Sequence, residues 1–543
     1  MSQEFGRFDF IIVGAGSAGC VLANRLSESG RHRVLLLEAG GRDLNPWIHV
    51  PLGYGKLFTD EKVNWRYYTE PEPGLDGRKI FQPRGRVLGG SSSINGLVYV
   101  RGQKEDFDRW RQAGNAGWSY GDVLPYFIKS EDQERGASAY HGAGGPLSVC
   151  DQSEPHELCD AFIAAAEQAG HPRTDDFNGA EQEGAGYFQT TSRHGRRCST
   201  AVAYLNPAAR RPNLTIATGA AVRRVLFEGR CAVGVEWRRG HEIFQAKADG
   251  EVILSAGAIN TPQLMQVSGV GPGGLLSSLG VDVVHASAGV GENLQDHLQV
   301  RCVFRCKKPI TVNDDMAALH RTLWMGLRYL AQRKGPLTVS AGYAGGFFRT
   351  DARLASPDIQ VHFINFSLNK MGDKLDPFSG FTASSCHLQP ESRGWVRATS
   401  PDMAVPPAIL ANYLATETDR TANVAGLRLI RQIMSQPAMA PYMASESVPG
   451  PGIESDEQLL AYVRATGSSI YHPTCSARMG VDPGAVVDPR LKVIGVEGLR
   501  IADGSILPSV VSGNSNAAIV MIGEKAADMI LQDAVAAPAR DAA

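Results

Sequence analysis

The sequence lacks the features that mark several classes of protein. No apolar run reaches the roughly 18 residues that a membrane-spanning helix needs. Lysine plus arginine (54) nearly balance aspartate plus glutamate (56), so the chain offers no concentrated basic face for nucleic acid. The nine cysteines form no C-x-x-C pair, which argues against a disulfide framework or a zinc site. We therefore expect no nucleic-acid partner, no bound metal and no transmembrane segment.

The N-terminus lacks a charged-then-apolar leader, because a strand-like segment begins almost at once at residues 8–13. The dispersed cysteines favour a reducing compartment. We therefore expect a cytoplasmic protein. Peripheral attachment to the cytoplasmic membrane is not readable from these features and stays open.

The sequence does have the size and composition of a globular enzyme with two domains. Its 543 residues exceed the usual size of one compact core. Hydrophobic residues make up 43% and charged residues 20%, which is typical of a folded, water-soluble chain. Much of the glycine gathers in clusters at 14–19, 85–96 and 269–274, as expected where backbone packs against a ligand.

The chain opens with a predicted βαβ unit. An apolar strand over residues 10–13 leads into the glycine motif of residues 14–19, and a helix is expected over 18–29. A second apolar strand over 33–37 ends in Glu38. This order of strand, glycine motif, helix and acid predicts a dinucleotide-binding site.

Each glycine of the motif has an expected role. Gly14 allows the tight turn, Gly16 lets the backbone approach the pyrophosphate at the helix N-terminus, and Gly19 allows close contact between helix and sheet. Glu38 is placed to bind ribose hydroxyls, and its carboxylate would repel the extra phosphate of NADP. The motif alone does not decide between FAD and NAD.

Later segments add to the same domain. Residues 251–257 and 499–504 both predict a strand that runs into a glycine turn, and residues 517–532 predict a long helix. Between them, residues 358–363 alternate like a strand and residues 411–434 are helical in pattern. We expect an α/β fold in which a discontinuous Rossmann-like nucleotide-binding domain carries a second, α+β substrate domain. The predicted division assigns 1–155, 190–305 and 466–543 to the first domain, and 156–189 and 306–465 to the second.

Two longer motifs are far more specific than the glycine triplet. The segment Gly85-Arg86-Val87-Leu88-Gly89-Gly90-Ser91-Ser92-Ser93-Ile94-Asn95-Gly96 and the segment from Gly257 to Gly271 resemble the two signatures of the glucose–methanol–choline (GMC) oxidoreductase family. The segments 293–297 and 503–505 fall in the family's order, and the resemblance covers essentially the whole chain. Within the family, the chain is most similar to the choline dehydrogenase and aliphatic alcohol dehydrogenase branch.

The resemblance implies a tightly held FAD. Some relatives attach the flavin through a histidine in the first signature, and Ile94 holds that place here, so we expect non-covalent FAD. The residues expected to bind the cofactor are Gly14, Gly16, Ser17, Ala18, Gly19, Glu38, Ala39, Arg86, Gly89, Gly90, Ser91, Asn95, Gly96, Val222, Ala256, Gly257, Asp503, Gly504 and Asn516.

The stretch from Tyr471 to Gly480 is similar to the family's catalytic segment, and His472 falls on the catalytic histidine. A neutral imidazole suits removal of the hydroxyl proton while the carbon-bound hydride moves to flavin N5. Asn516 matches the family's second catalytic position, where an amide can hold the substrate oxygen, and it could also cap the helix that follows. That helix could direct its dipole at the flavin. Tyr471 is expected to line the substrate pocket.

The sequence thus predicts oxidation of a primary alcohol to an aldehyde, with oxygen or a quinone as the electron acceptor. This chain has Cys475-Ser476-Ala477 where the branch commonly has Gly-Thr-Cys, which weakens any inference about substrate or acceptor. A lyase or light-driven decarboxylase of the same fold is the first alternative. An NAD-linked dehydrogenase and a non-enzymatic nucleotide-binding module are the others.

Overall fold

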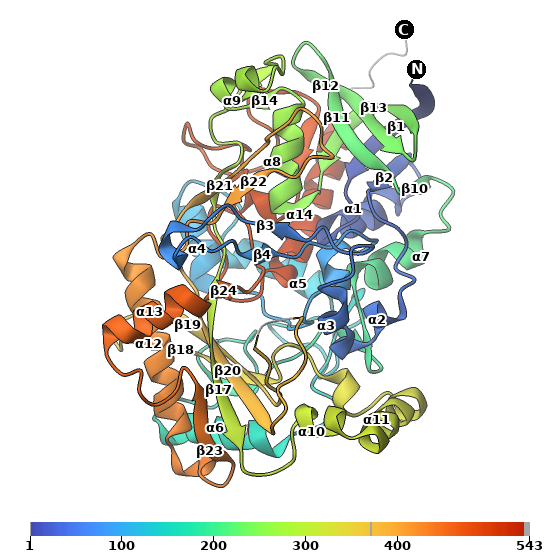
Figure 1. The fold of residues 1–543 in the computed structure, drawn as a ribbon. Helices are drawn as coiled ribbons and strands as arrows, with labels where there is room; N and C mark the ends of the chain where they lie inside the picture. The colour runs from blue at the N-terminus through green and yellow to red at the C-terminus, as the bar shows by residue number, and fades with distance from the viewer. Residues whose placement is uncertain (1, 370–371, 537–543) are drawn as a thin grey trace.

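Two large β-sheets lie in different halves of the molecule (Figure 1). The computed structural model describes residues 2–369 and 372–536. Each sheet has its own hydrophobic core and its own covering helices. The expected α/β architecture is confirmed.

The first sheet has seven strands and mixes parallel with antiparallel pairs. Its order is β10 (Leu214–Thr218), β2 (Val34–Glu38), β1 (Gln3–Val13), β13 (Glu242–Leu254), β12 (Cys231–Arg239) and β11 (Ala221–Glu228), with β25 (Leu499–Ile501) also paired to β13. The strands from β10 to β13 run parallel, as does β25, whereas β12 and β11 return antiparallel. The beginning, middle and end of the chain therefore meet in one sheet.

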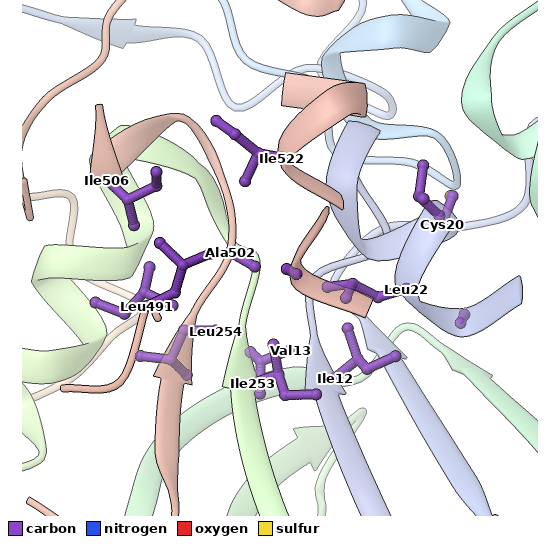
Figure 2. Packing of buried hydrophobic residues seen from close by; sticks show 14 of the residues in the cluster. Ile12, Val13, Cys20, Leu22, Ile253, Leu254, Leu491, Ala502, Ile506 and Ile522 are labelled. Carbon is purple, nitrogen blue, oxygen red and sulfur yellow. The ribbon is translucent and has the colours of Figure 1, made fainter. Parts of the chain in front are cut away.

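Continuous apolar strands explain why this sheet is buried on both faces. Every residue of β2 is buried, and so are the last four residues of β1. Figure 2 shows Ile12, Val13 and Leu254 of the sheet in one hydrophobic cluster with Leu22 of α1 (Ser17–Ser27) and Ile522 of α14 (Asn516–Ala536). This core fixes the N-terminal ends of α1 and α14 at the carboxyl edge of the parallel strands, where nucleotide ligands bind in such folds.

The second sheet is antiparallel throughout and also has seven strands. Its order is β23 (Met443–Val448), β17 (Leu298–Cys306), β20 (Gly380–His387), β19 (Ile359–Ile364), β18 (Ala344–Phe348) and β7 (Gly184–Tyr187), with β24 (Ser468–Ser469) also paired to β17. Helices α6 and α12 pack on this sheet. The predicted division into two domains stays a prediction, and the pairing of β17 would move its boundary from 305 to about 297.

The helices are α1 (Ser17–Ser27), α2 (Pro46–His49), α3 (Tyr54–Leu57), α4 (Lys104–Gln112), α5 (Tyr120–Ser130), α6 (Glu157–Gln168), α7 (Asn206–Ala208), α8 (Gly257–Val267), α9 (Gly273–Ser278), α10 (Val312–Ala317), α11 (Leu319–Gln332), α12 (Glu417–Met434), α13 (Asp456–Thr466) and α14 (Asn516–Ala536). The short strands are β3 (Tyr67–Tyr68), β4 (Phe81–Gln82), β5 (Glu131–Gln133), β6 (Leu147–Val149), β8 (Ser192–Arg193), β9 (Arg196–Arg197), β14 (Val270–Gly271), β15 (His285–Ala286), β16 (Glu292–Leu294), β21 (Gly394–Arg397) and β22 (Ala408–Leu410). Within the described ranges, no helix is long and apolar enough to cross a membrane.

One predicted helix begins later than expected. The pattern predicts a helix from residue 411, but α12 starts at Glu417. Asn412 and Leu414 both have a left-handed φ of 59°, which a right-handed helix does not allow. The side chain of Thr416 then accepts a hydrogen bond from the Asp419 N–H and caps the helix.

Candidate active site

The glycine motif forms a tight turn between β1 and α1. Gly14 has a φ of +101°, and a Cβ at this position would lie 2.5 Å from the Ser255 carbonyl oxygen of the neighbouring strand connection. A Cβ on Gly19 would lie 1.9 Å from the Gly14 carbonyl oxygen, so only glycine allows the helix to approach the turn. The first turn of α1 is thereby left facing a cavity with its free N–H groups.

That first cavity runs along the carboxyl edge of the parallel strands. It is lined by residues from both ends and the middle of the chain, including Trp65 and Met403. Of the residues predicted to bind the cofactor, those that line it are Gly14, Gly16, Ser17, Ala18, Glu38, Ala39, Arg86, Gly90, Ser91, Val222, Ala256, Gly257, Asp503 and Gly504. Gly19 and Gly89 lie outside its lining, and both serve the packing of the turns.

Two buried carboxylates hold the turns that border this cavity. Glu38 accepts hydrogen bonds from the N–H groups of Ala15 (3.0 Å) and Gly40 (2.8 Å), and burial raises the pKa of Glu38 to about 7. Asp503 accepts from the Gly257 N–H at 2.8 Å and the Thr261 hydroxyl at 2.6 Å. Burial also raises the pKa of Asp503. Both acids therefore shape the cavity wall as well as lining it.

A second cavity continues from the first. The two share Ser17, Arg84, Ser91 and Ile519 in their linings. Of the predicted residues, those that line the second cavity are Asn95, Gly96, Tyr471, His472 and Asn516, together with Ser17 and Ser91. Ile94 lines it as well. The structure thus places His472 in a space that opens directly onto the glycine-lined cavity.

The loop that carries His472 is held from behind by Asp296. One carboxylate oxygen of Asp296 accepts from the backbone N–H of His472 (2.8 Å) and from that of His297 (2.9 Å). Tyr471 and Cys475 on either side of the loop have left-handed φ values of 72° and 74°. Non-glycine residues rarely adopt this conformation, and such strain gathers at functional sites. The strained loop presents the imidazole to the second cavity.

Hydrogen bonds fix which nitrogen of His472 is basic. The Leu388 carbonyl can only accept, so His297 Nε2, at 2.9 Å, carries the proton and donates to it. In neutral His297, Nδ1 is then an acceptor, and the Nδ1–H of His472 donates to it at 3.1 Å. His472 Nε2 is left without a proton. The two-histidine relay therefore holds the tautomer that a general base needs.

The side chain opposite Nε2 belongs to Asn514, not to Asn516. Asn514 Nδ2 lies 3.2 Å from His472 Nε2 and donates to it, while Asn514 Oδ1 accepts from the Gln360 amide at 3.2 Å. Asn516 Oδ1 instead accepts from the Ser17 hydroxyl at 2.8 Å. The sequence predicts that Asn516 holds the substrate oxygen, and this role stays a prediction, whereas the hydrogen bond to His472 is made by Asn514.

Burial and neighbouring charge keep both histidines neutral. The pKa of His472 is lowered well below 6.5, first by burial and then by His297, His362 and Arg84. Burial likewise lowers the pKa of His297. A neutral His472 is ready to accept a proton at neutral pH.

Several cavity residues were not predicted from the sequence. Besides Asn514 these are Gln299, Arg301, His362, Thr382 and Ser384 of the second sheet, and Arg84 at the junction of the two cavities. The alternation of β17 carries the one sequence signal for them, because Gln299 and Arg301 interrupt an apolar run two residues apart. The other positions come from strands that are adjacent only in the folded sheet.

Comparison with known proteins relates the chain to flavoenzymes. Residues 8–299 and 390–523 match the two parts of the GMC oxidoreductase family. The chain is 47% identical to mitochondrial choline dehydrogenase of Mus musculus, over 96% of this chain and 89% of that protein. It is 43% identical to an alcohol dehydrogenase [acceptor] of Pseudomonas putida, over 97% and 96%. A formate oxidase of Aspergillus oryzae RIB40, solved in a study of FAD modification, superimposes with a TM-score of 0.92 at 28% identity, over 98% and 99% of the two chains.

Proposed function

The chain belongs to the GMC oxidoreductase family, and from that membership we propose which residues carry out its reaction. It is an FAD-dependent oxidoreductase that oxidises an alcohol. The family membership sets the cofactor and the class of reaction. The geometry of the two cavities supports the assignment of roles.

The first cavity suits FAD. Gly16 and Gly90 approach so closely that a Cβ on Gly90 would lie 2.6 Å from the Gly16 Cα, which keeps side chains out of the space beside the α1 N-terminus. A dinucleotide pyrophosphate binds at such a helix N-terminus. Glu38 and Asp503 would hold the ribose and the flavin end, in the proposed assignment. FAD, when bound, supplies the hydride acceptor.

We further propose that the FAD is held without a covalent bond. Ile94 lines the second cavity at the position where some relatives carry a linking histidine, and its hydrocarbon side chain has no group that could form such a bond. The remaining contacts to the cofactor are then the polar and backbone groups of the first cavity.

In the proposed mechanism, His472 Nε2 removes the hydroxyl proton of the alcohol. The single observation that carries this assignment is the tautomer of neutral His472, which leaves Nε2 unprotonated at the second cavity. An alcohol oxygen beside these two groups could donate its proton to Nε2, in place of the present Asn514 contact, and accept a hydrogen bond from Asn514 Nδ2. Loss of the proton helps to expel the hydride from the same carbon. The product from a primary alcohol is an aldehyde.

The lyase or light-driven decarboxylase alternative has no support. The relatives compared above are dehydrogenases and an oxidase. For the electron acceptor, oxygen and a quinone both remain in the proposal, because the cavity residues favour neither.

The proposed function is tested by mixing the purified yellow protein with a panel of alcohols without oxygen. Bleaching of the flavin band by a primary alcohol is expected, whereas a spectrum that no alcohol changes would contradict alcohol oxidation. Parallel assays of dye reduction and peroxide production on the same panel then separate a dehydrogenase from an oxidase.

A further inference from the structure

The second cavity is positively charged. Its described lining includes two arginines, Arg84 and Arg301, and no aspartate or glutamate. Burial lowers the pKa of Arg84 to about 10, which still leaves its guanidinium protonated at neutral pH. His472 and His362 are neutral there, since burial lowers the pKa of both. Asp296, behind the His472 loop, accepts five hydrogen bonds and lies outside the cavity lining.

Arg301 is directed into this cavity by the alternation of β17. Val300 and Cys302 on either side of it are buried in the core of the second sheet, so Arg301 projects from the opposite face, as Gln299 does. The backbone of Arg301 pairs with Ser384 of β20, and its carbonyl accepts a hydrogen bond from the Tyr462 hydroxyl at 2.6 Å. Among the described residues, its guanidinium has no hydrogen-bond or ion-pair partner.

Arg84 is less available to a ligand. Its Nε and one terminal nitrogen both donate to backbone carbonyls, of Pro83 and of Tyr471, at 2.5 Å each. It therefore contributes positive charge and holds the His472 loop, whereas Arg301 offers a free planar fork. Such a fork matches a carboxylate, with which it forms two parallel hydrogen bonds.

We infer that the alcohol substrate carries a carboxylate, which pairs with Arg301, and that a quaternary ammonium alcohol is a poor substrate. This inference rests on the proposed function. The cavity has aromatic rings, from Tyr54, Phe58 and Tyr471, that could face a cation. Two arginines and no acid in the same small space outweigh them, because like charges repel strongly where water is scarce. The chain would then differ in substrate from the choline dehydrogenase to which it is similar.

The test compares anaerobic flavin reduction by matched alcohols. The pairs are 3-hydroxypropanoate with 1-propanol and 6-hydroxyhexanoate with 1-hexanol, and choline is the cationic alcohol. A hydroxy acid should reduce the flavin with a second-order rate constant on the order of 10- to 100-fold above that of its neutral partner, the usual worth of a charged hydrogen bond. Choline should react more slowly than the neutral alcohols.

Variants at two arginines of the same strand make the test specific. Arg301→Gln should abolish the preference for the hydroxy acid, chiefly through weaker binding, and Arg301→Lys should restore part of it. Arg305→Gln is the matched control, because Arg305 lies on β17 but is exposed and outside the cavity lining. Arg305→Gln should react with every alcohol of the panel as the unaltered enzyme does.

The outcomes separate this inference from the proposed function. A choline rate above that of the hydroxy acids, or an unchanged preference in Arg301→Gln, would overturn the inference while leaving alcohol oxidation intact. A flavin that no alcohol reduces in the unaltered enzyme would instead overturn the proposed function.

Helix α11 lies at the edge of the second half of the molecule (Figure 1) and carries an exposed apolar face. Leu319, Leu323, Leu327 and Leu330 recur every three or four residues and so share one face of the helix. They are 75%, 58%, 60% and 68% exposed, and Trp324 beside them is 67% exposed. Soluble proteins rarely leave such a contiguous apolar face in water.

The opposite face of α11 buries few residues, but a hydrogen bond and an ion pair attach it to the rest of the protein. Only Met325 and Tyr329 of the helix are buried. The Tyr329 hydroxyl donates to the Gly195 carbonyl at 3.1 Å, and Arg328 forms an ion pair with Glu154. The leucine face therefore points away from the rest of the protein.

Positive charge surrounds the C-terminal end of this face. Residues 319–334 contain four basic residues, including Arg333 and Lys334, and no acid. The β8–β9 hairpin, whose Arg193 and Arg196 are exposed, contacts this end of α11 through Gly195. An apolar helix face bordered by cations matches the acyl chains and headgroups of an anionic bilayer, and it would repel a second copy of itself.

We propose that α11 lies in the surface of an anionic lipid bilayer with its leucine face and Trp324 among the acyl chains. The test is flotation of the purified holoenzyme with vesicles of phosphatidylcholine containing or lacking phosphatidylglycerol. Binding should require the anionic lipid. The double variant Leu323→Glu with Leu327→Glu should lower vesicle binding at least about tenfold, given the apolar area that two leucines bury. Val283→Glu is the control, because Val283 is an exposed apolar residue that follows α9 in the sequence, and α9 lies at the other end of the molecule from α11 (Figure 1).

Trp324 gives a second readout. Brominated lipids should quench part of the tryptophan emission of the bound enzyme, and Trp324→Phe should lose that part. Binding unaffected by the double leucine variant, or quenching unaffected by Trp324→Phe, would overturn the proposal. So would a dimer in sedimentation of the free enzyme that the leucine variant abolishes, because the face would then bind a second copy.

Discussion

Asn514 Nδ2 lies 3.2 Å from His472 Nε2, and this contact brings the segment before α14 against the strained loop of the base. Asn516, two residues later, instead bonds to Ser17 at the N-terminus of α1. The two asparagines therefore face different tasks. In the proposed mechanism Asn514 borders the reacting oxygen, whereas Asn516 ties together the two helix N-termini beside the first cavity.

The two asparagines should accordingly differ on substitution. Asn514→Ala removes the donor expected to hold the substrate oxygen, so the rate of flavin reduction should fall on the order of 10²-fold with FAD content unchanged. Asn516→Ala should leave that rate within a few-fold per bound flavin and should mainly lower FAD retention. Stopped-flow reduction and flavin-to-protein absorbance ratios measure the two effects. A larger rate loss in Asn516→Ala than in Asn514→Ala would contradict the assignment.

The lowered pKa of His472 predicts how activity depends on pH. A base works only when unprotonated, and lowering its pKa keeps it unprotonated to more acidic pH. The rate of flavin reduction should therefore stay on its plateau through pH 6.5 and fall only below that value. A profile of the reduction rate against pH, with substrate saturating at each point, measures the pH at which the rate falls. A rate that has already fallen to half its plateau at a pH above 6.5 would be inconsistent with the buried, neutral imidazole.

His297 should act as a positioning residue through its bond to His472. His297→Leu removes the acceptor for the His472 Nδ1–H, which holds the tautomer of the base, so the reduction rate should fall about tenfold. His297→Gln can still accept that hydrogen bond and should recover most of the rate. A purely structural role for His297 would lower yield or stability in both variants while leaving the reduction rate per bound flavin unchanged.

Non-covalent attachment gives a simple release experiment. Acid or heat denaturation should leave the precipitated chain colourless and all the flavin in the supernatant, where mass spectrometry should find intact FAD. Ile94→His places an imidazole where the linking residue stands in some relatives. The flavin that stays on the precipitate of this variant can be compared with that on the unaltered protein. Yellow colour on the washed precipitate of the unaltered protein would contradict the prediction.

Local pattern was enough to predict the nucleotide-binding part of the fold. The apolar run before Gly14, the glycine spacing and Glu38 each reflect one short-range constraint, and the structure places them around one turn. The pairing of β1 with both β2 and β13 also follows the expected parallel sheet. Sequence and structure agree here because neighbouring residues decide the geometry.

The substrate side was less predictable because it depends on long-range contacts. Asn514 and Asn516 are equivalent as residue types, and only the start of α14 and the position of His472 decide which one reaches the base. The relay from Leu388 through His297 joins three segments that are far apart in sequence. The sequence around Arg301 predicts only a strand, and the folded sheet is needed to show that its face lines the second cavity.

In the proposed mechanism, His472 takes the hydroxyl proton as hydride leaves the alcohol carbon. It is tested most directly by anaerobic stopped-flow reduction of the flavin in His472→Gln and His472→Ala, compared with the unaltered enzyme at equal FAD content. The reduction rate should fall on the order of 10²-fold or more in both variants while FAD stays bound, the usual worth of a positioned base. Near-normal reduction in either variant would contradict it.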